Sequence, residues 1–118
     1  MGRLSTHVLD TANGCPAHGI KIELFRLDNQ GARHAIAVAT TNADGRTESP
    51  LLDDQTCLAG WYELNFHIGP YFEAKGTQHP KMTFLDLIPI RFHIAEPNGR
   101  YHVPLVCSPW SYSTYRGS

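Results

Sequence analysis

The chain has 118 residues, of which 42% are hydrophobic and 18% charged, and its formal net charge is −1. It is long enough for one domain, and too apolar and too weakly charged to remain disordered. No apolar run approaches the ~20 residues that span a bilayer, and no cluster of basic residues could follow a phosphate backbone. We therefore expect a single domain over residues 1–118, with neither a membrane nor a nucleic acid as partner.

Apolar and polar residues alternate with period two through most of the chain, which is typical of strands that have one buried face. In chain order this pattern predicts strands over residues 4–9, 20–24, 36–40, 62–68, 84–94, 101–106 and 111–115. Turn residues such as Asn13-Gly14, Asp44-Gly45 and Pro97-Asn98-Gly99 separate the runs. About seven or eight short strands in such a chain indicate an all-β sandwich, with the apolar residues of each run facing the core.

Two places depart from simple alternation. Residues 70–76 begin with proline and end with glycine, which predicts one or two helical turns. Pro89 lies within the long run 84–94, where Phe84 and Ile88 are expected on the same face. Because proline cannot donate a backbone hydrogen bond to a neighbouring strand, this run is expected to be an edge strand or a bulged one.

The cysteines indicate the cellular compartment of the protein rather than a metal or redox site. Cys15, Cys57 and Cys107 form no CxxC pair, and no basic-led apolar segment resembling a signal peptide opens the chain. An odd number of cysteines in this context favours reduced thiols in the cytoplasm. Cys15 and His18 have half of a metal-like spacing, but the second half of a zinc site is missing, so we expect no metal.

Seven histidines are the unusual feature of the composition, because protonating all of them would move the formal charge from −1 to +6. His7 and His102 each place a proton-active ring in a predicted strand, although an ordinary polar-face histidine fits the same pattern. Ser5 and His7 do not form a nucleophile pair, because residues two apart on a strand are ~6.6–7 Å apart. Arg46 follows a turn and is either a solvated side chain or a guanidinium that stabilises an oxyanion.

The last eleven residues are unusual for a chain end. Chain ends are commonly polar and poorly ordered, whereas aromatic and hydroxyl residues here continue almost to the last position. This composition predicts a final strand whose free carboxylate is held in place.

Four segments carry a resemblance to a known family. They are LSTHVLDTANGCPA near the start, DGR at 44–46, YHVPL at 101–105 and SPWSYSTYRGS at the end. Together they resemble the transthyretin-related proteins, and within them the 5-hydroxyisourate hydrolases rather than the hormone carriers. The terminal YRGS is the most specific segment, because the carrier branch departs from the enzymes there. The likeness covers nearly the whole chain, but about 50–82 has no recognisable signature.

The resemblance implies a transthyretin-like sandwich of two four-stranded sheets with one short helix. It also implies a homotetramer, a dimer of dimers, with an active site in the channel between dimers. The functional positions of the family correspond here to His7, Arg46, His102, Tyr115, Arg116, Gly117 and Ser118.

The implied reaction is the hydrolysis of 5-hydroxyisourate to 2-oxo-4-hydroxy-4-carboxy-5-ureidoimidazoline in urate breakdown, with no metal or cofactor. His7 and His102 would be the acid–base pair, in an order that the sequence leaves open, and Arg46 would orient substrate and stabilise charge. Tyr115 and Ser118 would shape the floor of the site. Arg116 would anchor the terminal carboxylate or contact substrate. The alternative is a carrier that binds an aromatic ligand in the same channel.

Overall fold

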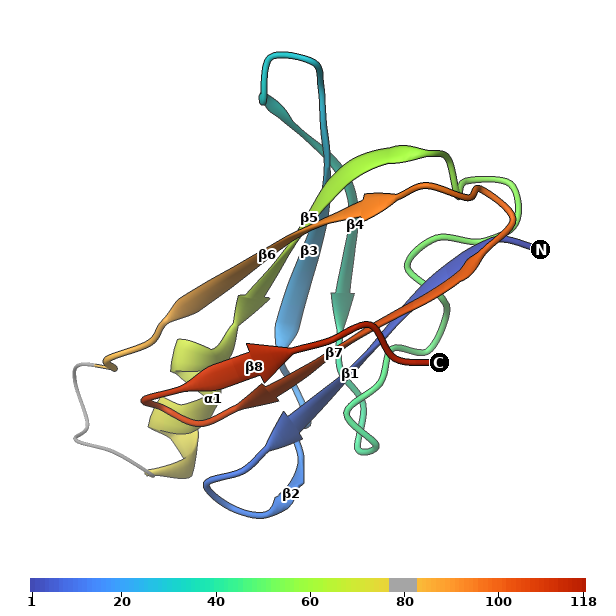
Figure 1. Cartoon of the computed structure of the whole chain (residues 1–118). Helices are drawn as coiled ribbons and strands as arrows, with labels where there is room; N and C mark the ends of the chain where they lie inside the picture. Colours follow the sequence, from blue (N-terminus) through green and yellow to red (C-terminus); the bar gives the residue numbers. More distant parts are fainter. Residues whose placement is uncertain (77–82) are drawn as a thin grey trace.

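The computed structural model describes residues 1–76 and 83–118. In these ranges the chain forms eight strands and one helix, arranged as a sandwich of two four-stranded sheets (Figure 1). In chain order the elements are β1 (Arg3–Asp10), β2 (Cys15–Pro16), β3 (Lys21–Leu27), β4 (Arg33–Thr40), β5 (Gly60–His67), α1 (Ile68–Lys75), β6 (Leu87–Ile94), β7 (Arg100–Cys107) and β8 (Tyr112–Thr114). The predicted all-β sandwich with one short helix is confirmed. No helix in the described ranges is long and apolar enough to cross a membrane.

The two sheets have the strand orders β2-β1-β7-β8 and β4-β3-β5-β6. β1 and β7 pair in parallel, whereas β3 pairs antiparallel with both of its neighbours. Large side chains that are almost fully buried fill the space between the sheets, among them Leu4, Ile22, Leu24, Tyr62, Leu64, Phe66, Ile94 and Leu105. Burial of each such aliphatic side chain contributes roughly 1.5–3 kcal/mol, so this layer provides a rigid support for the sheet surfaces.

The helix α1 follows β5 directly and ends where the sequence predicts. It begins at Ile68, two residues before the expected start at Pro70. Gly76 caps its end in the left-handed conformation with φ 66°, which glycine adopts without strain. Tyr71 is buried and its hydroxyl donates to Asp10 Oδ2 at 2.7 Å, so the helix is fixed to the end of β1.

Two apolar runs differ from the prediction, one in which of its residues are buried and the other in where its strand begins. Ile36 and Val38 of β4 are 46% and 65% exposed, whereas Ala37 and Ala39 pack against the core. Every residue from 35 to 39 is apolar, so a period of two does not reveal which set faces inward. Phe84 is 75% exposed and precedes β6, so the long run becomes a strand only at residue 87.

The prediction that Pro89 lies on an edge strand is confirmed. Pro89 belongs to β6, which is the last strand in its sheet. β8 is an edge strand of the other sheet, so each sheet has one edge strand that comes from the C-terminal half of the chain. The backbone groups on the free sides of these two strands have no partner strand in a single chain, and such edges are normally protected.

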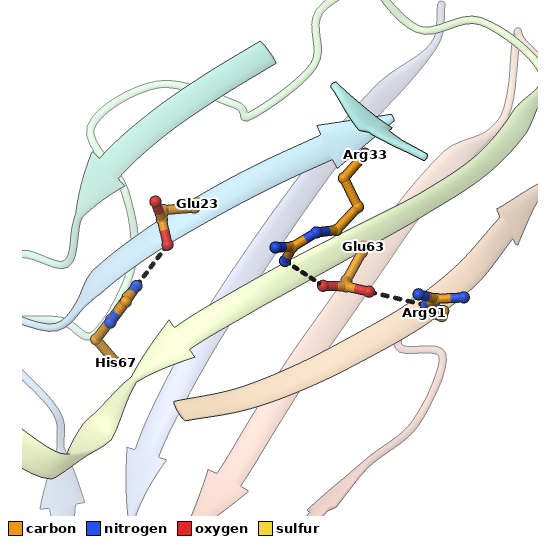
Figure 2. Close-up of polar contacts among 5 residues, drawn as sticks. All are labelled: Glu23, Arg33, Glu63, His67 and Arg91. Carbon is orange, nitrogen blue, oxygen red and sulfur yellow. Dashed lines mark hydrogen bonds and ion pairs between the residues drawn. The ribbon is translucent and has the colours of Figure 1, made fainter. Parts of the chain in front are cut away.

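The outer face of the β4-β3-β5-β6 sheet carries a network of charged side chains (Figure 2). Glu63 of β5 lies at its centre, where it accepts from Arg91 Nε at 2.8 Å and from Arg33 Nη1 at 3.1 Å. The Glu63 side chain is only 5% exposed. This burial would raise the pKa of Glu63, but the hydrogen bonds and charges of the two arginines outweigh it and hold the pKa below its ordinary value.

Glu63→Gln should lower the free energy of unfolding by about 2 kcal/mol at pH 7, because the amide leaves two guanidinium groups without their charged acceptor. Since the folded pKa is depressed, this contribution exists above the unfolded pKa and is lost as pH falls through the folded value. Urea unfolding from pH 7 to pH 3 measures it. The control is Glu73→Gln, the same change on the exposed face of α1, which should alter stability by less than ~0.5 kcal/mol. A Glu63→Gln effect that does not shrink in acid would contradict this account.

Candidate active site

The parallel pairing of β1 with β7 brings the two histidine-containing segments side by side. Ser5 is opposite His102, and His7 is opposite Pro104 two positions further along. Leu4, Thr6 and Val8 of β1 point into the core, so Ser5 and His7 share the other face, and both are half-buried. The two histidines therefore come from neighbouring strands of one sheet.

A tight turn places Arg46 beside these strands. Gly45 has φ 74°, and a Cβ on it would lie 2.4 Å from the Val8 carbonyl oxygen, so no larger residue fits. The Val8 N–H donates to the Gly45 carbonyl at 2.8 Å, which ties the turn to β1. Asn42 holds Arg46 from both sides: its Oδ1 accepts from the Arg46 N–H at 3.2 Å, and its N–H donates to the Arg46 carbonyl at 2.8 Å. The guanidinium thus extends from a fixed backbone.

The turn also fixes which ring nitrogen of His7 carries the proton when the ring is neutral. His7 Nε2 lies 2.9 Å from the Asp44 carbonyl oxygen. Because a carbonyl only accepts, Nε2 carries a proton and donates it. In neutral His7 the unprotonated nitrogen is therefore Nδ1.

The end of the chain lies along β7. β8 pairs antiparallel with β7, and Gly117 continues the same register opposite His102. The Gly117 N–H donates to the His102 carbonyl at 2.8 Å. A Cβ on Gly117 would lie 2.6 Å from His102 Cδ2, so only glycine lets the backbone approach the ring this closely.

A cavity of about 470 Å³ opens where these elements meet. Its lining consists of Arg3, Ser5, Thr6, Arg46, Thr47, Glu48, Ser49, Pro50, Arg100, Tyr101, His102 and Ser118. Of the residues expected from the sequence, Arg46, His102 and Ser118 thus meet at one cavity. His7 is not part of this lining; it lies on the same face of β1 as Ser5, opposite Pro104 of β7.

The surroundings of His102 favour the neutral ring. Burial lowers the pKa of His102 below its ordinary value, and the positive charges of Arg46 and His7 lower it further. A hydrogen bond with the Ser5 backbone acts in the opposite direction but does not outweigh them. His102 is therefore unprotonated at neutral pH and available to accept a proton.

Tyr115 and Arg116 lie elsewhere in the single chain. They line a second cavity of about 320 Å³, together with residues of β6 and β7. The Arg116 guanidinium stacks over the Tyr101 ring, 4.3 Å from its centroid. The terminal tetrapeptide thus divides, because Ser118 lines the histidine cavity and Gly117 packs against His102, whereas the two residues before them line the second cavity.

The structure adds residues that the sequence analysis did not assign to this site. Ser5 bonds His102 across the strand pair, and Arg3 and Arg100 contribute two more guanidinium groups to the cavity lining. Arg3 and Arg100 are opposite each other in the β1–β7 register, which a single sequence does not reveal. Within residues 1–76 and 83–118, no group of three or more His, Cys, Asp or Glu side chains is placed to hold a metal ion.

Two four-stranded sheets, a short helix after β5 and a polar cavity on one sheet define the class of transthyretin-like sandwiches. A family model described as HIUase/Transthyretin family matches residues 4–117. The chain belongs to this family, which confirms the resemblance carried by its sequence segments.

Individual comparisons extend over almost the whole chain. 5-Hydroxyisourate hydrolase 2 of Rhizobium meliloti (strain 1021) is 55% identical over 117 residues, 99% of this chain and 97% of the relative. The crystal structure of (S)-allantoin synthase matches with a TM-score of 0.91 and 49% identity over 99% of this chain, which spans 44% of that protein. Sea bream transthyretin in complex with thyroxine matches with a TM-score of 0.85 and 27% identity, over 98% of this chain and 94% of that one.

Proposed function

We propose that this protein hydrolyses 5-hydroxyisourate to 2-oxo-4-hydroxy-4-carboxy-5-ureidoimidazoline. The observation that carries the proposal is the meeting of His102 and Arg46 at one cavity, with His7 on the strand next to that of His102. The name of the 55% identical relative supports the same substrate. A neutral imidazole and a fixed guanidinium at one polar cavity suit the addition of water to a carbonyl group.

The reaction opens a ring by cleaving an amide bond. A water oxygen forms a bond to C6 of the substrate, the C6–N1 bond breaks, and C6 becomes a carboxylic acid that releases its remaining proton to solvent and is then a carboxylate. One group must take a proton from water, another must give a proton to N1, and a cation must stabilise the negative charge that develops on the C6 oxygen. We assign the proton transfers to His7 and His102 as a pair, and the stabilisation of charge to Arg46.

The terminal residues complete this assignment. Ser118 lies on the cavity and would orient the substrate or the water by hydrogen bonding. Gly117 allows the close backbone approach that keeps the terminus against His102. Tyr115 and Arg116 face a different cavity of the single chain, so their proposed contact with substrate depends on how chains assemble.

The direct test is an ultraviolet time course of freshly generated 5-hydroxyisourate with and without the protein. We expect its decay to accelerate in proportion to the protein concentration. Decay at the spontaneous rate would refute the hydrolase and leave the carrier that the similarity to sea bream transthyretin suggests. The presence of three guanidinium groups in the cavity lining fits a small polar substrate better than an aromatic hormone.

We further propose a homotetramer, a dimer of dimers, as the active form. β6 and β8 each form one of the two free edges of their sheets, and pairing each with its copy across a two-fold axis would protect these two edges. Light scattering should give four times the 13.2 kDa of one chain. A mass of one chain at micromolar concentration, together with full activity, would contradict this assembly.

We also propose that the protein is located in the cytoplasm, which is supported by three cysteines that form no disulfide.

A further inference from the structure

Ser5 makes one contact that the proposed roles do not use. Its Oγ lies 2.9 Å from His102 Nδ1, between residues 97 positions apart in sequence. The contact follows from the parallel register, in which Ser5 of β1 stands opposite His102 of β7. No other hydrogen bond of this hydroxyl occurs among the residues that the structure describes, so the group is available to the imidazole alone.

The His102 ring is held from two directions. Ser5 bonds its Nδ1, and the backbone of Gly117 packs so close to Cδ2 that a Cβ there would lie at 2.6 Å. His102 Nε2, on the other side of the ring, has no hydrogen-bond partner in the described part of the chain. Since His102 also lines the cavity, Nε2 is the ring atom left to act on a bound molecule.

The charges around the cavity decide which nitrogen carries the proton. A serine hydroxyl can donate to Nδ1 or accept from it, so the contact by itself allows both tautomers. The charged groups of the lining are Arg3 from β1, Arg100 from β7, Arg46 and Glu48 from the loop, and the carboxylate of Ser118; His7 of β1 adds to them. Three guanidinium groups favour a lone pair over an N–H on the nitrogen that faces them.

We propose that Ser5 is a positioning residue for His102: its Oγ accepts the Nδ1–H and holds Nε2 unprotonated toward the cavity. This inference rests on the proposed hydrolysis and assigns the base within it. Nε2 of His102 takes a proton from water as the water oxygen bonds to C6. The resulting imidazolium keeps Nδ1–H on Ser5. The proton for N1 comes from doubly protonated His7, which gives up Nδ1–H and keeps Nε2–H on the Asp44 carbonyl. A hydrogen bond on one ring nitrogen of a histidine commonly decides whether the other ring nitrogen carries a proton.

Ser5→Ala and Ser5→Thr test the proposal. Ser5→Ala should lower kcat by roughly 10-fold or more with little change in KM, because the ring is no longer held in one orientation. An oxygen that accepts from Nδ1–H stabilises the charged ring, so loss of the Ser5 hydroxyl should move the acid limb of the kcat/KM profile to lower pH. Ser5→Thr keeps the hydroxyl and should retain both the rate and the limb.

Nitrogen NMR of the His102 ring supplies a readout that needs no turnover. In the unaltered protein Nδ1 should give the shift of a protonated nitrogen and Nε2 that of an unprotonated one, and Ser5→Ala should mix the two tautomers. A protonated Nε2 in the unaltered protein would overturn the proposal, as would a Ser5→Thr enzyme as impaired as Ser5→Ala. Failure of the hydrolysis itself would appear separately, as an unaltered protein that does not turn over whatever its ring shifts.

Discussion

Replacing His102 by asparagine is expected to lower kcat/KM for 5-hydroxyisourate by at least ~10²-fold, because a general acid–base group supplies about 10²–10⁴ in rate. The fold should survive, since His102 is half-buried at the surface of its sheet rather than in the core. His7→Asn should have an effect of similar size. Initial rates from ultraviolet absorbance, with thermal unfolding measured on the same samples, separate loss of chemistry from loss of structure.

His34→Asn is the matched control for both variants. His34 is an exposed histidine on β4 of the other sheet, where its Nε2 lies 3.0 Å from Asp28 Oδ2. It should keep the rate of the unaltered enzyme. A His102→Asn enzyme within threefold of that rate would remove His102 from the proton transfers, whatever its stability.

Adding residues after Ser118 should lower activity by roughly 10²-fold or more while stability changes little. Gly117 is bonded to the backbone of His102 and Ser118 lies on the cavity, so added chain must either enter the cavity or pull this segment away. A displacement of about 1 Å at a reacting group is enough for a loss of that size. Removing residues 115–118 should have a similar effect, because it takes away Gly117 and opens the cavity to water.

The two ends of the chain should respond differently. A tag placed before Met1, which is 79% exposed, should leave the rate unchanged. Gly117→Ala changes no chain length and should still reduce activity, since its Cβ would collide with the His102 ring. A tag after Ser118 that leaves the rate unaltered would show that the terminus is only a surface segment. The test is to measure rates and unfolding temperatures for the two tagged proteins, the protein without residues 115–118, and Gly117→Ala.

Much of the fold could be predicted from the sequence because strand periodicity is a local signal. The run from Tyr62 to Phe66 alternates large apolar and polar residues, and it forms β5 with the expected buried face. The same signal fails for Ile36 and Val38, where alanines fill the other face and both sets are apolar. A period defines two faces, and only the size and polarity of the residues say which one is buried.

The candidate site was predictable in part for a related reason. His7, Arg46 and His102 could be selected because imidazole and guanidinium suit the chemistry and because the segments resemble a known family. Their neighbours could not be selected, since a strand pattern does not say which strand lies beside it. Ser5 was considered only with His7, two residues away, whereas its partner is His102 on β7. Residues brought together by non-local pairing have no signature in one sequence.

The parallel contact between β1 and β7 also has a kinetic consequence. The first long strand of the chain pairs with residues 100–107, so it has no partner in its own sheet except the short β2 until almost all of the chain has left the ribosome. Closing such a long loop is entropically costly, and folds dominated by distant pairings commonly take milliseconds to seconds to form. The sheet β4-β3-β5-β6 lacks this constraint, because its strands pair within residues 21–94. Assembly of the His102 cavity is therefore a late event of folding, and no nascent chain that stops short of β7 contains it.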